Sequence, residues 1–339
     1  MSTINDVAKL AGVSTATVSR VLNDYAHVSP AVLEKVMGAI DHLGYEPNQM
    51  AKNLRTRKTS RLIVTVPNIA NTFFANIIRG VEEAALAAGY TVLLGDVGYT
   101  SASGGNSEDA YAGLLRRKEA DGMIFLGHTL PVSLNDLVAK KGASAPIVNG
   151  CEFSDSLKVS SVHIDNALAA RQIMDHLYAL GHQRIGVITG DLRSPISRDR
   201  LQGVTASADQ HGRSNDLTIV TGDYSIECGA AMTTHLLAQT KRPTAIFCFS
   251  DDMAFGALHA IRLAGLNCPA DMSVAGFDDV NLSRFSAPSL TTVRQPMHEI
   301  GRKTVELLLG IIDSGVTERV NITLDHELVF RESTAAPRA

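Results

Sequence analysis

A short polar segment near the N-terminus, TATVSRVLN (15–23), carries side chains that could read a DNA duplex. Hydroxyl groups at the start of a helix can meet phosphates and base edges. Arg20, one turn later, could reach the O6 and N7 atoms of a guanine in the major groove. Val18, Val21 and Leu22 would pack inward and leave the polar side chains outside. The pattern favours a DNA-recognition helix over a three-helix cap on a larger domain, because a cap gives the polar face no purpose.

The segment PNQMAKNLR (47–55) is basic and places Leu54 among polar neighbours. Pro47 can begin a helix, and Lys52 and Arg55 are cationic. A helix of about eight residues is too short to be stable alone in water. The segment is therefore either a basic linker or a helix that folds on DNA and inserts Leu54 into the minor groove.

The motifs of common enzyme and metal sites are missing from the sequence. It contains no GxSxG, GxxxxGK[ST] or HExxH motif, and no GxGxxG follows an expected strand. His128 and His182 have no serine or aspartate partner at motif spacing. The four cysteines lie far apart with no CxxC pair, which argues against a zinc site or a disulfide framework. We therefore expect a protein that is not an enzyme and that needs no metal or cofactor.

Composition indicates a globular protein of two or three domains. The chain has 339 residues, of which 45% are hydrophobic and 19% charged. No apolar run is long enough for a transmembrane helix, and the first residues lack the basic and apolar regions of a secretory signal. Together with the scattered cysteines, this predicts a cytoplasmic, nucleoid-associated protein with no membrane partner.

Charge is distributed unevenly along the chain. Residues 1–60 carry seven basic and five acidic side chains, whereas the remainder carries 24 basic and 30 acidic ones, for a net charge of −4 overall. The stretch 47–61 has five basic residues and no acidic residue. This asymmetry indicates a small nucleic-acid-binding module attached to an acidic body.

Three short helices are expected to position the polar segment. The first covers 3–11 and is broken at Gly12, the second covers 15–23, and the third runs from Pro30 to Leu43 before Gly44. Two short helices joined at a glycine turn, with a third beside them, form a helix-turn-helix.

From residue 61 the pattern changes to strands alternating with helices. A strand at 61–66 is followed by a helix at 74–88, and this alternation continues for about 220 residues, which predicts parallel sheets covered by helices on both faces. We expect an α/β body of two doubly wound lobes with about six strands each. Ligands in such folds lie beyond the carboxyl ends of the strands, here between the lobes.

The chain resembles the lactose/galactose repressor (LacI/GalR) family of bacterial transcription regulators over essentially its whole length. In the N-terminal part the resemblance is carried by TINDVAKLAGVSTATVSRVLN (3–23), VSPAVLEKVMGAIDHLGYEPN (28–48) and AKNLR (51–55). In the body it is carried by FFANIIRGVEEAALAAGYTVLLGD (73–96), DG (121–122), HIDN (163–166), LGHQRIGVITG (180–190), RLQGV (200–204), SDDMAFGAL (250–258), GFDDV (276–280) and LTTVRQP (290–296). The phrases VHIDN, RLQG and LLLG are most similar to the cytidine-repressor branch.

The resemblance implies a repressor that binds palindromic operator DNA as a homodimer. Its parts would be a helix-turn-helix head (1–46), a hinge helix and linker (47–60), a body that binds an effector and dimerises (61–330), and a tail (331–339). The body would resemble type I periplasmic binding proteins. Its first lobe would cover about 61–162 plus 293–322, and its second lobe about 163–292 plus 323–330. The chain ends without a heptad segment, so we expect no tetramer arm.

The family pattern also implies a set of DNA-binding residues. Ala16 is too small for a bidentate amide contact to adenine, so base reading should depend on Arg20 and Thr15, while Leu54 would enter the central step of the operator. The complete expected set is Thr3, Ser14, Thr15, Ala16, Thr17, Ser19, Arg20, Asn23, His27, Asn48, Ala51, Lys52, Leu54 and Arg55.

The effector site is implied position by position as well. Arg200 and Asp278 would come from different strand ends of the second lobe and bind ligand polar groups, with aromatic walls on both lobes and Ser250 beside them. Ser250 stands where several sugar-responsive relatives have asparagine, and Ile196 is apolar where others are polar. The full set is Phe73, Phe74, Arg200, Tyr224, Ser250 and Asp278.

Several alternatives stay open at this point. The effector is either a small sugar or a nucleoside. Phe74 could belong to the core, and Arg200 could pair with Asp199 or Asp278 instead of a ligand. A solute-binding protein of a transporter would share the body, but it would need a signal peptide and no head.

Overall fold

The computed structural model describes residues 2–23, 28–45, 58–98, 107–128, 132–141, 145–153, 158–314 and 318–338. The chain divides into two compact units, Met1–Thr59 and Ser60–Ala339, which we call the head and the body. Each unit has a hydrophobic core of its own.

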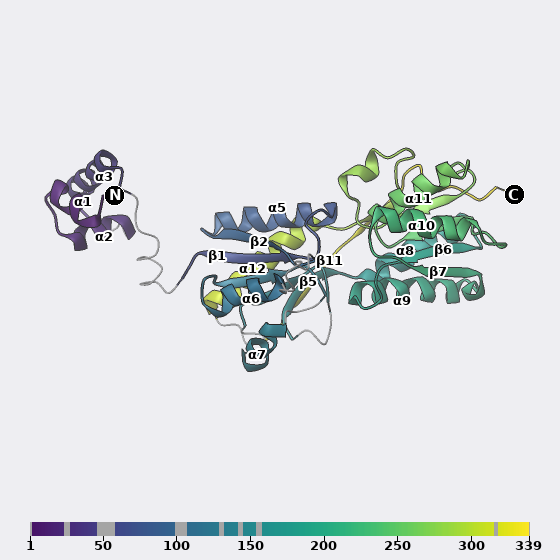
Figure 1. Cartoon of the computed structure of the whole chain (residues 1–339), viewed down its shortest axis with the longest axis horizontal. Coiled ribbons are helices and arrows are strands. Elements are labelled where there is room, and N and C mark those ends of the chain that lie inside the picture. The colour runs from purple at the N-terminus through teal and green to yellow at the C-terminus, as the bar shows by residue number, and fades with distance from the viewer. Residues whose placement is uncertain are drawn as a thin grey trace. The chain divides into compact units, whose positions relative to one another are not determined.

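The described residues of the head form three helices: α1 (Ile4–Ala11), α2 (Thr15–Asn23) and α3 (Pro30–Leu43) (Figure 1). Gly12 takes a left-handed conformation, with φ of 68°, between α1 and α2, which is the glycine turn that the sequence predicts. Val7, Val18, Val21 and Val36 have no exposed surface and form the centre of the head core. The predicted helix-turn-helix is confirmed.

The first lobe of the body is built on a six-stranded parallel sheet. From edge to edge its strands are β11 (Asn321–Leu324), β5 (Ser160–Ile164), β4 (Ile147–Gly150), β3 (Gly122–Phe125), β1 (Arg61–Val66) and β2 (Thr91–Asp96). Leu62 of β1 lies opposite both Val92 of β2 and Gly122 of β3. β5 ends at residue 164 and β11 at residue 324, which is two residues past the first-lobe boundaries predicted at about 162 and 322. The chain adds β11 to this sheet after it has built the second lobe.

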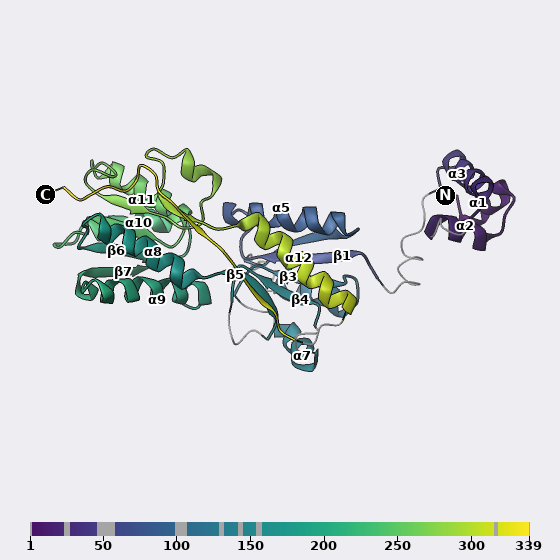
Figure 2. The same ribbon diagram turned by 180° about the vertical axis from the view of Figure 1, so that it is seen from behind.

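Helices cover both faces of that sheet (Figures 1 and 2). Leu62 and Val64 of β1 point into the core beneath α5 (Thr72–Ala87) and α12 (Met297–Ser314), and these two helices pack on each other. Ile63 points the opposite way, toward α6 (Ser107–Arg116) and α7 (Val132–Lys141). Because neighbouring residues of a strand face opposite sides, a nearly continuous apolar run can fill both cores.

The second lobe is built on a four-stranded parallel sheet, and the expectation of about six strands was wrong here. The strand order is β7 (Leu217–Thr221), β6 (Ile185–Thr189), β8 (Ala245–Cys248) and β9 (Ser273–Ala275). Its helices pack in pairs, α8 (Asn166–Ala179) with α9 (Pro195–Gln210) and α10 (Ile226–Leu237) with α11 (Asp251–Leu263). Two 3₁₀ turns, Ser214–Asp216 and Asn281–Arg284, complete the lobe.

The chain passes between the lobes three times. The passages follow β5, β10 (Thr292–Arg294) and β11, and β10 pairs with β12 (Glu327–Val329) as a separate antiparallel ribbon. Within the described part of the chain, no helix has the length and apolar character needed to cross a membrane. The same residues hold no cluster of three side chains suited to binding a metal ion.

Candidate functional site

The polar residues predicted to read DNA lie on and just before α2. Ser14, Thr15, Ala16 and Arg20 are exposed, whereas Thr17 and Ser19 are half-buried. The opposite face of the same helix is buried through Val18 and Val21, which holds α2 on the head core and turns the exposed side chains to solvent. The side chain of Asn23 lies outside the described residues.

Two residues predicted to contact DNA, Thr3 and Ser14, use their hydroxyl groups to cap the starts of helices. The Thr3 hydroxyl donates to Asp6 Oδ2 at 2.7 Å and accepts from the Asp6 amide, which makes a capping box at the start of α1. Ser14 Oγ accepts from the Thr17 amide at 3.1 Å and lies 2.9 Å from the Thr17 hydroxyl. Thr15, Ala16 and Arg20 are therefore the positions whose side chains are most open to a partner.

The remaining predicted DNA contacts fall on parts of the chain that the structure does not describe. They are His27 and the hinge residues Asn48, Ala51, Lys52, Leu54 and Arg55.

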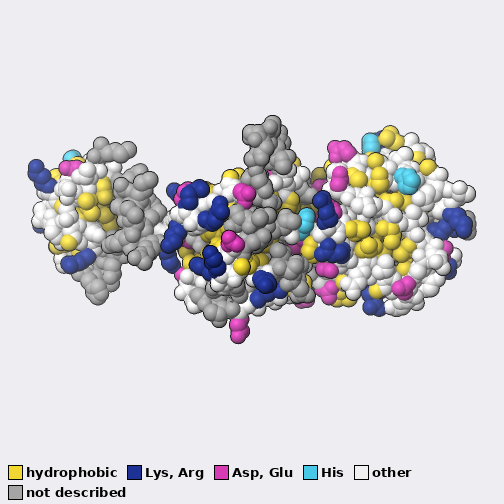
Figure 3. Space-filling view, turned by 60° about the horizontal axis from the view of Figure 1, so that its bottom comes forward, with side chains coloured by type: hydrophobic (Ala, Val, Ile, Leu, Met, Phe, Trp, Pro, Cys, Tyr) yellow, Lys and Arg dark blue, Asp and Glu magenta, His cyan; other side chains and the backbone are white. Residues whose placement is uncertain are grey.

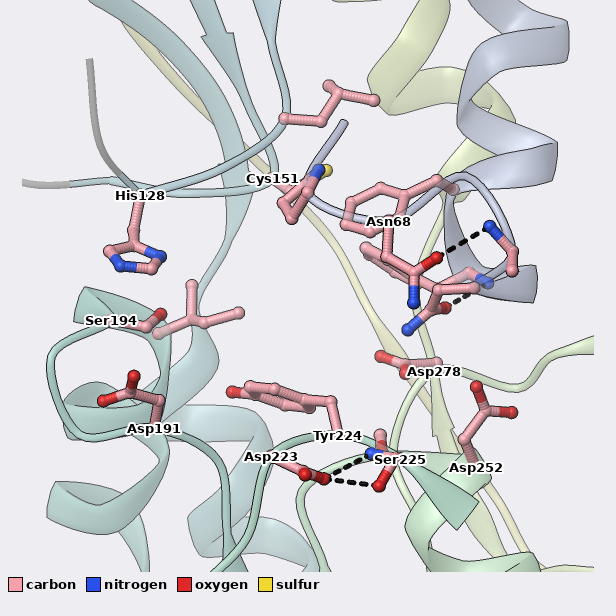
Figure 4. Close-up of a pocket in the computed structure, with 18 of the residues that line it drawn as sticks. Asn68, His128, Cys151, Asp191, Ser194, Asp223, Tyr224, Ser225, Asp252 and Asp278 are labelled. Carbon is pink, nitrogen blue, oxygen red and sulfur yellow. Dashed lines mark hydrogen bonds between the residues drawn. The ribbon is translucent and has the colours of Figure 1, made fainter. Parts of the chain in front are cut away.

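A cavity of about 440 Å³ lies between the two lobes of the body, and all six predicted effector residues line it. The first lobe contributes the segment before α5 and the segments that follow β3 and β4. The second lobe contributes the starts of α9, α10 and α11. In Figure 4 the labelled side chains of both lobes face this shared space.

Aromatic rings line the cavity on both lobes. Phe73 and Phe74 meet edge to face on the first lobe, with ring centroids 5.2 Å apart. Tyr224, on the second lobe, has φ of 69°, and its hydroxyl lies 2.6 Å from that of Ser197. A Cβ at Gly190 would stand 2.1 Å from the tyrosine ring, so a glycine there is required for the ring to occupy this place. Flat apolar surfaces thus face a ligand from two sides.

Arg200 lies inside α9, and the expectation that it comes from a strand end was wrong. Its side chain is almost fully buried, with Nε donating to Asn166 Oδ1 at 2.9 Å and Nη1 donating to the carbonyl of Phe249. The guanidinium lies over the ring of Phe277, and Nη2 is 4.0 Å from Asp278 Oδ1. Arg200 therefore ties three segments of the second lobe together, in addition to lining the cavity.

Asp278 reaches the cavity from the segment after β9. Its Oδ1 accepts a hydrogen bond from Gln295 Nε2 at 2.7 Å. Burial raises the pKa of this carboxyl well above its usual range, and the nearby charge of Arg200 opposes that rise. Asp278 is thus a buried polar group beside a ligand-sized space, which suits it to bind ligand hydroxyl or amine groups.

Ser250 and its neighbour Asp251 organise the start of α11. The Ser250 hydroxyl accepts from the Met253 amide at 3.2 Å, as an N-cap residue does. Asp251 is fully buried and accepts hydrogen bonds from Val280 N, Ser283 Oγ and Thr292 Oγ1. Asp251 therefore shapes the segment that carries Asp278, without lining the cavity itself.

The sequence reasoning missed several acidic lining residues. Glu152 follows β4 in the first lobe, and Asp191, Asp223 and Asp252 follow β6, β7 and β8 in the second. Their position just beyond parallel strands was a usable signal, because such edges face the ligand in doubly wound folds. Glu152 is buried, and burial raises its pKa to about 8.

Comparisons with known proteins agree with this architecture. Residues 3–48 match the model for bacterial regulatory proteins of the lacI family, and residues 174–334 match the periplasmic binding protein-like domain. The transcriptional repressor CytR of Escherichia coli is 38% identical over 336 residues, which cover 99% of this chain and 97% of CytR.

Two solved structures show the same arrangement of elements. The lac repressor dimer bound to operator and an anti-inducer superimposes with a TM-score of 0.86 at 31% identity, covering 99% of each chain. The complex of the transcriptional regulator CelR with cellobiose gives a TM-score of 0.72 at 31% identity, covering 98% of this chain and 100% of that one. This chain belongs to the lacI family of bacterial regulatory proteins.

Proposed function

We propose that this protein is a transcriptional repressor that binds a palindromic operator as a homodimer. Its affinity for the operator would rise or fall when a small ring compound binds between the lobes. Membership of the lacI family over nearly the whole chain, with CytR among the relatives, is the observation that carries this proposal. The lac repressor is similar over its full length in a structure bound to operator DNA.

The cavity supports a sugar or a nucleoside as the effector. Aromatic rings on both lobes can stack on a flat ring, and Asp278 can accept from hydroxyl or amine groups. The similar regulator CelR is seen in complex with cellobiose, which favours a sugar. The resemblance of this sequence to the cytidine-repressor branch favours a nucleoside. The proposed class is a small polyhydroxylated ring.

Control of DNA binding would follow from unequal ligand affinity for two arrangements of the lobes. A ligand can shift such an equilibrium only by the difference between its two affinities. Coupling of about 1–3 kcal/mol, or roughly 5- to 150-fold in DNA affinity, is the usual range for such proteins.

A gel shift on a palindrome from the upstream region of the protein's own gene tests the proposal. We expect binding that is specific and salt-sensitive, and that changes when one member of a sugar and nucleoside panel is added. Equal affinity for cognate and scrambled DNA would contradict the proposal. A transporter's solute-binding protein is the second candidate, and it would bind panel compounds but not DNA.

The hinge gives a separate test of how the DNA is bound. We propose that residues 47–58 fold on the operator and that Leu54 enters a central CG step. Hydrogen exchange should show fast amides there in the free protein and slow ones in the complex. Leu54→Ala should lose DNA bending and specific affinity but keep dimerisation and effector binding. Slow exchange in the free protein, equal to that of the 30–43 helix, would contradict folding on DNA.

A further inference from the structure

The cavity between the lobes is lined by far more acidic than basic side chains. Glu152, Asp191, Asp223, Glu227, Asp252 and Asp278 line it, and among the described lining residues the basic ones are Arg200 and His128. Hydrogen bonds from Arg193 lower the pKa of Asp191 to about 2. Burial raises the pKa of Asp223, but hydrogen bonds, mainly from Ser225, outweigh it and hold that pKa below the usual range, so both carboxyls are ionised at neutral pH. The lining therefore offers a ligand many carboxyl groups, and one of them, Asp191, is paired with the guanidinium of Arg193.

Neither basic lining residue is free to receive an anion. The Arg200 guanidinium already donates to Asn166 and Phe249, lies over Phe277 and is close to Asp278. Burial lowers the pKa of His128, so its imidazole is neutral at pH 7. Phosphate recognition in proteins relies on uncommitted arginine, lysine or backbone amides, and the lining side chains that the structure describes include no uncommitted arginine or lysine.

The helix ends at the cavity are also largely occupied. Three helices that begin there are capped by their own side chains: Asn71 accepts from Phe73 N in α5, Ser225 from Cys228 N in α10, and Ser250 from Met253 N in α11. At each of those ends the cap residue therefore already occupies one of the amides that a phosphate could use.

The start of α9 differs from the other three helix starts. Ser194 is its N-cap residue but makes no side-chain bond to its own helix. The Ser194 hydroxyl instead lies 3.4 Å from both carboxyl oxygens of Glu152. Glu152 belongs to the first lobe and Ser194 to the second, so this pair connects the lobes across the cavity that both residues line. A long contact of this kind leaves Glu152 with room for a further partner.

We infer that Glu152 is a specificity-determining residue of the effector cleft, and that the cleft selects an uncharged ring compound and rejects its phosphate ester. Glu152 would hold the ligand from the first lobe while Asp278 holds it from the second. The inference rests on the proposed control by a ligand between the lobes, and it narrows the chemical class of that ligand.

The protonation of Glu152 fits this role. Burial raises its pKa to about 8, and the charge of Arg200 and the hydrogen bond from Ser194 only partly oppose that rise. Asp199 raises the pKa further and Arg198 lowers it, while Cys151 lies next to it in the chain. At pH 7 the carboxyl is therefore mainly neutral and can donate a hydrogen bond to a ring nitrogen, carbonyl or hydroxyl of the ligand.

The first experiment compares matched pairs of compounds on the full-length protein. Ribose, cytidine and adenosine are titrated beside ribose 5-phosphate, cytidine 5′-monophosphate and adenosine 5′-monophosphate by calorimetry, and each is also added to the operator gel shift. We expect at least one parent compound to bind and its ester to bind at least tenfold more weakly.

An ester that binds within threefold of its parent overturns the inference while leaving the proposed repressor function intact. Operator binding with no response to any compound refutes the ligand control on which the inference rests.

The second experiment changes Glu152. Glu152→Ala should weaken the parent compound at least tenfold, whereas Glu152→Gln keeps a donor and should stay within about threefold at pH 7. Between pH 7 and 9 the wild type should lose affinity by about tenfold relative to Glu152→Gln, because the carboxyl of Glu152 ionises in this range and the amide of the variant does not. Glu318→Gln, the same change at an exposed position outside the cavity, is the matched control.

Should Glu152→Ala fail to fold, Ser194→Ala tests the same contact. Wild-type affinity in Glu152→Ala, or the same pH profile in wild type and Glu152→Gln, overturns the role of Glu152.

Discussion

The head and the body carry their candidate sites in opposite ways. In the head, the side chains proposed to read DNA project from one nine-residue helix, α2, and Thr15, Ala16 and Arg20 are exposed. In the body, the cavity is assembled from segments that span residues 67 to 278, and its central titratable residues, Glu152, Arg200 and Asp278, are buried. On the face of the body that Figure 3 shows, basic and acidic side chains occur on both lobes.

Two aspartates near helix starts show what this difference means physically. Asp6 in the head is exposed, and hydrogen bonds from Thr3 lower its pKa. Asp251 in the body also receives hydrogen bonds, from three donors, yet burial raises its pKa to about 7. An aspartate near a helix start is thus stabilised as an anion in the head, whereas burial in the body destabilises its ionised form. Desolvation, more than the local motif, decides the outcome in the body.

The largest effect should come from Asp251→Ala. The change leaves Val280 N and the hydroxyls of Ser283 and Thr292 without their buried acceptor, and each unmade bond costs about 1–3 kcal/mol. We expect the free energy of unfolding of the body to fall by roughly 3–5 kcal/mol in urea titrations followed by circular dichroism. A loss below about 1 kcal/mol would show that buried and exposed helix-start aspartates do not differ as the comparison states.

The next effect concerns Asp278 and ligand binding. Asp278→Ala should weaken the effector identified by the compound panel by about 1.5–3 kcal/mol, at least tenfold, because a buried hydrogen bond to the ligand is lost. Operator affinity without effector should stay as in the wild type, since the head is unchanged. Calorimetry and a gel shift measure the two quantities separately, and unchanged effector affinity would remove Asp278 from the site.

Arg20→Ala tests the exposed surface of the head. We expect a loss of about 1–3 kcal/mol on the cognate half-site, together with a relaxed preference at one base pair. Because Arg20 is exposed, the stability of the head should hardly change. Gel shifts on cognate and scrambled DNA provide the measurement. An equal loss on both would show that Arg20 contacts phosphate alone.

The smallest effect should come from Thr3→Ala. It removes the capping box of α1 and should lower the local stability of the head by about 1 kcal/mol. Hydrogen exchange of the α1 amides in the full-length protein reports this change, with the α8 amides of the body as internal control. A cost as large as that of Asp251→Ala would contradict the contrast between exposed and buried helix starts.

Local signals were sufficient to predict the head. Thr3, Gly12, Pro30 and Gly44 mark helix ends through backbone preferences that act within a few residues, and the apolar spacing of Val18 and Val21 defines the inward face of α2. The alternation of strands and helices likewise predicted the parallel α/β body. Strand number was predicted less well, because the short strands of the second lobe carry few residues with which to show a pattern.

The sequence by itself determined the three helices of the head and the parallel class of both lobes. The resemblance to the family also named six residues that the structure places on the lining of the cavity. The tertiary structure alone decided that Arg200 is committed to Asn166 and Phe249 from within a helix, and that Glu152 of one lobe meets Ser194 of the other. Neither contact has a sequence signal, because each joins residues more than 30 positions apart. The protonation state of Glu152 depends on its burial, and the carboxyl is buried only once both lobes have folded.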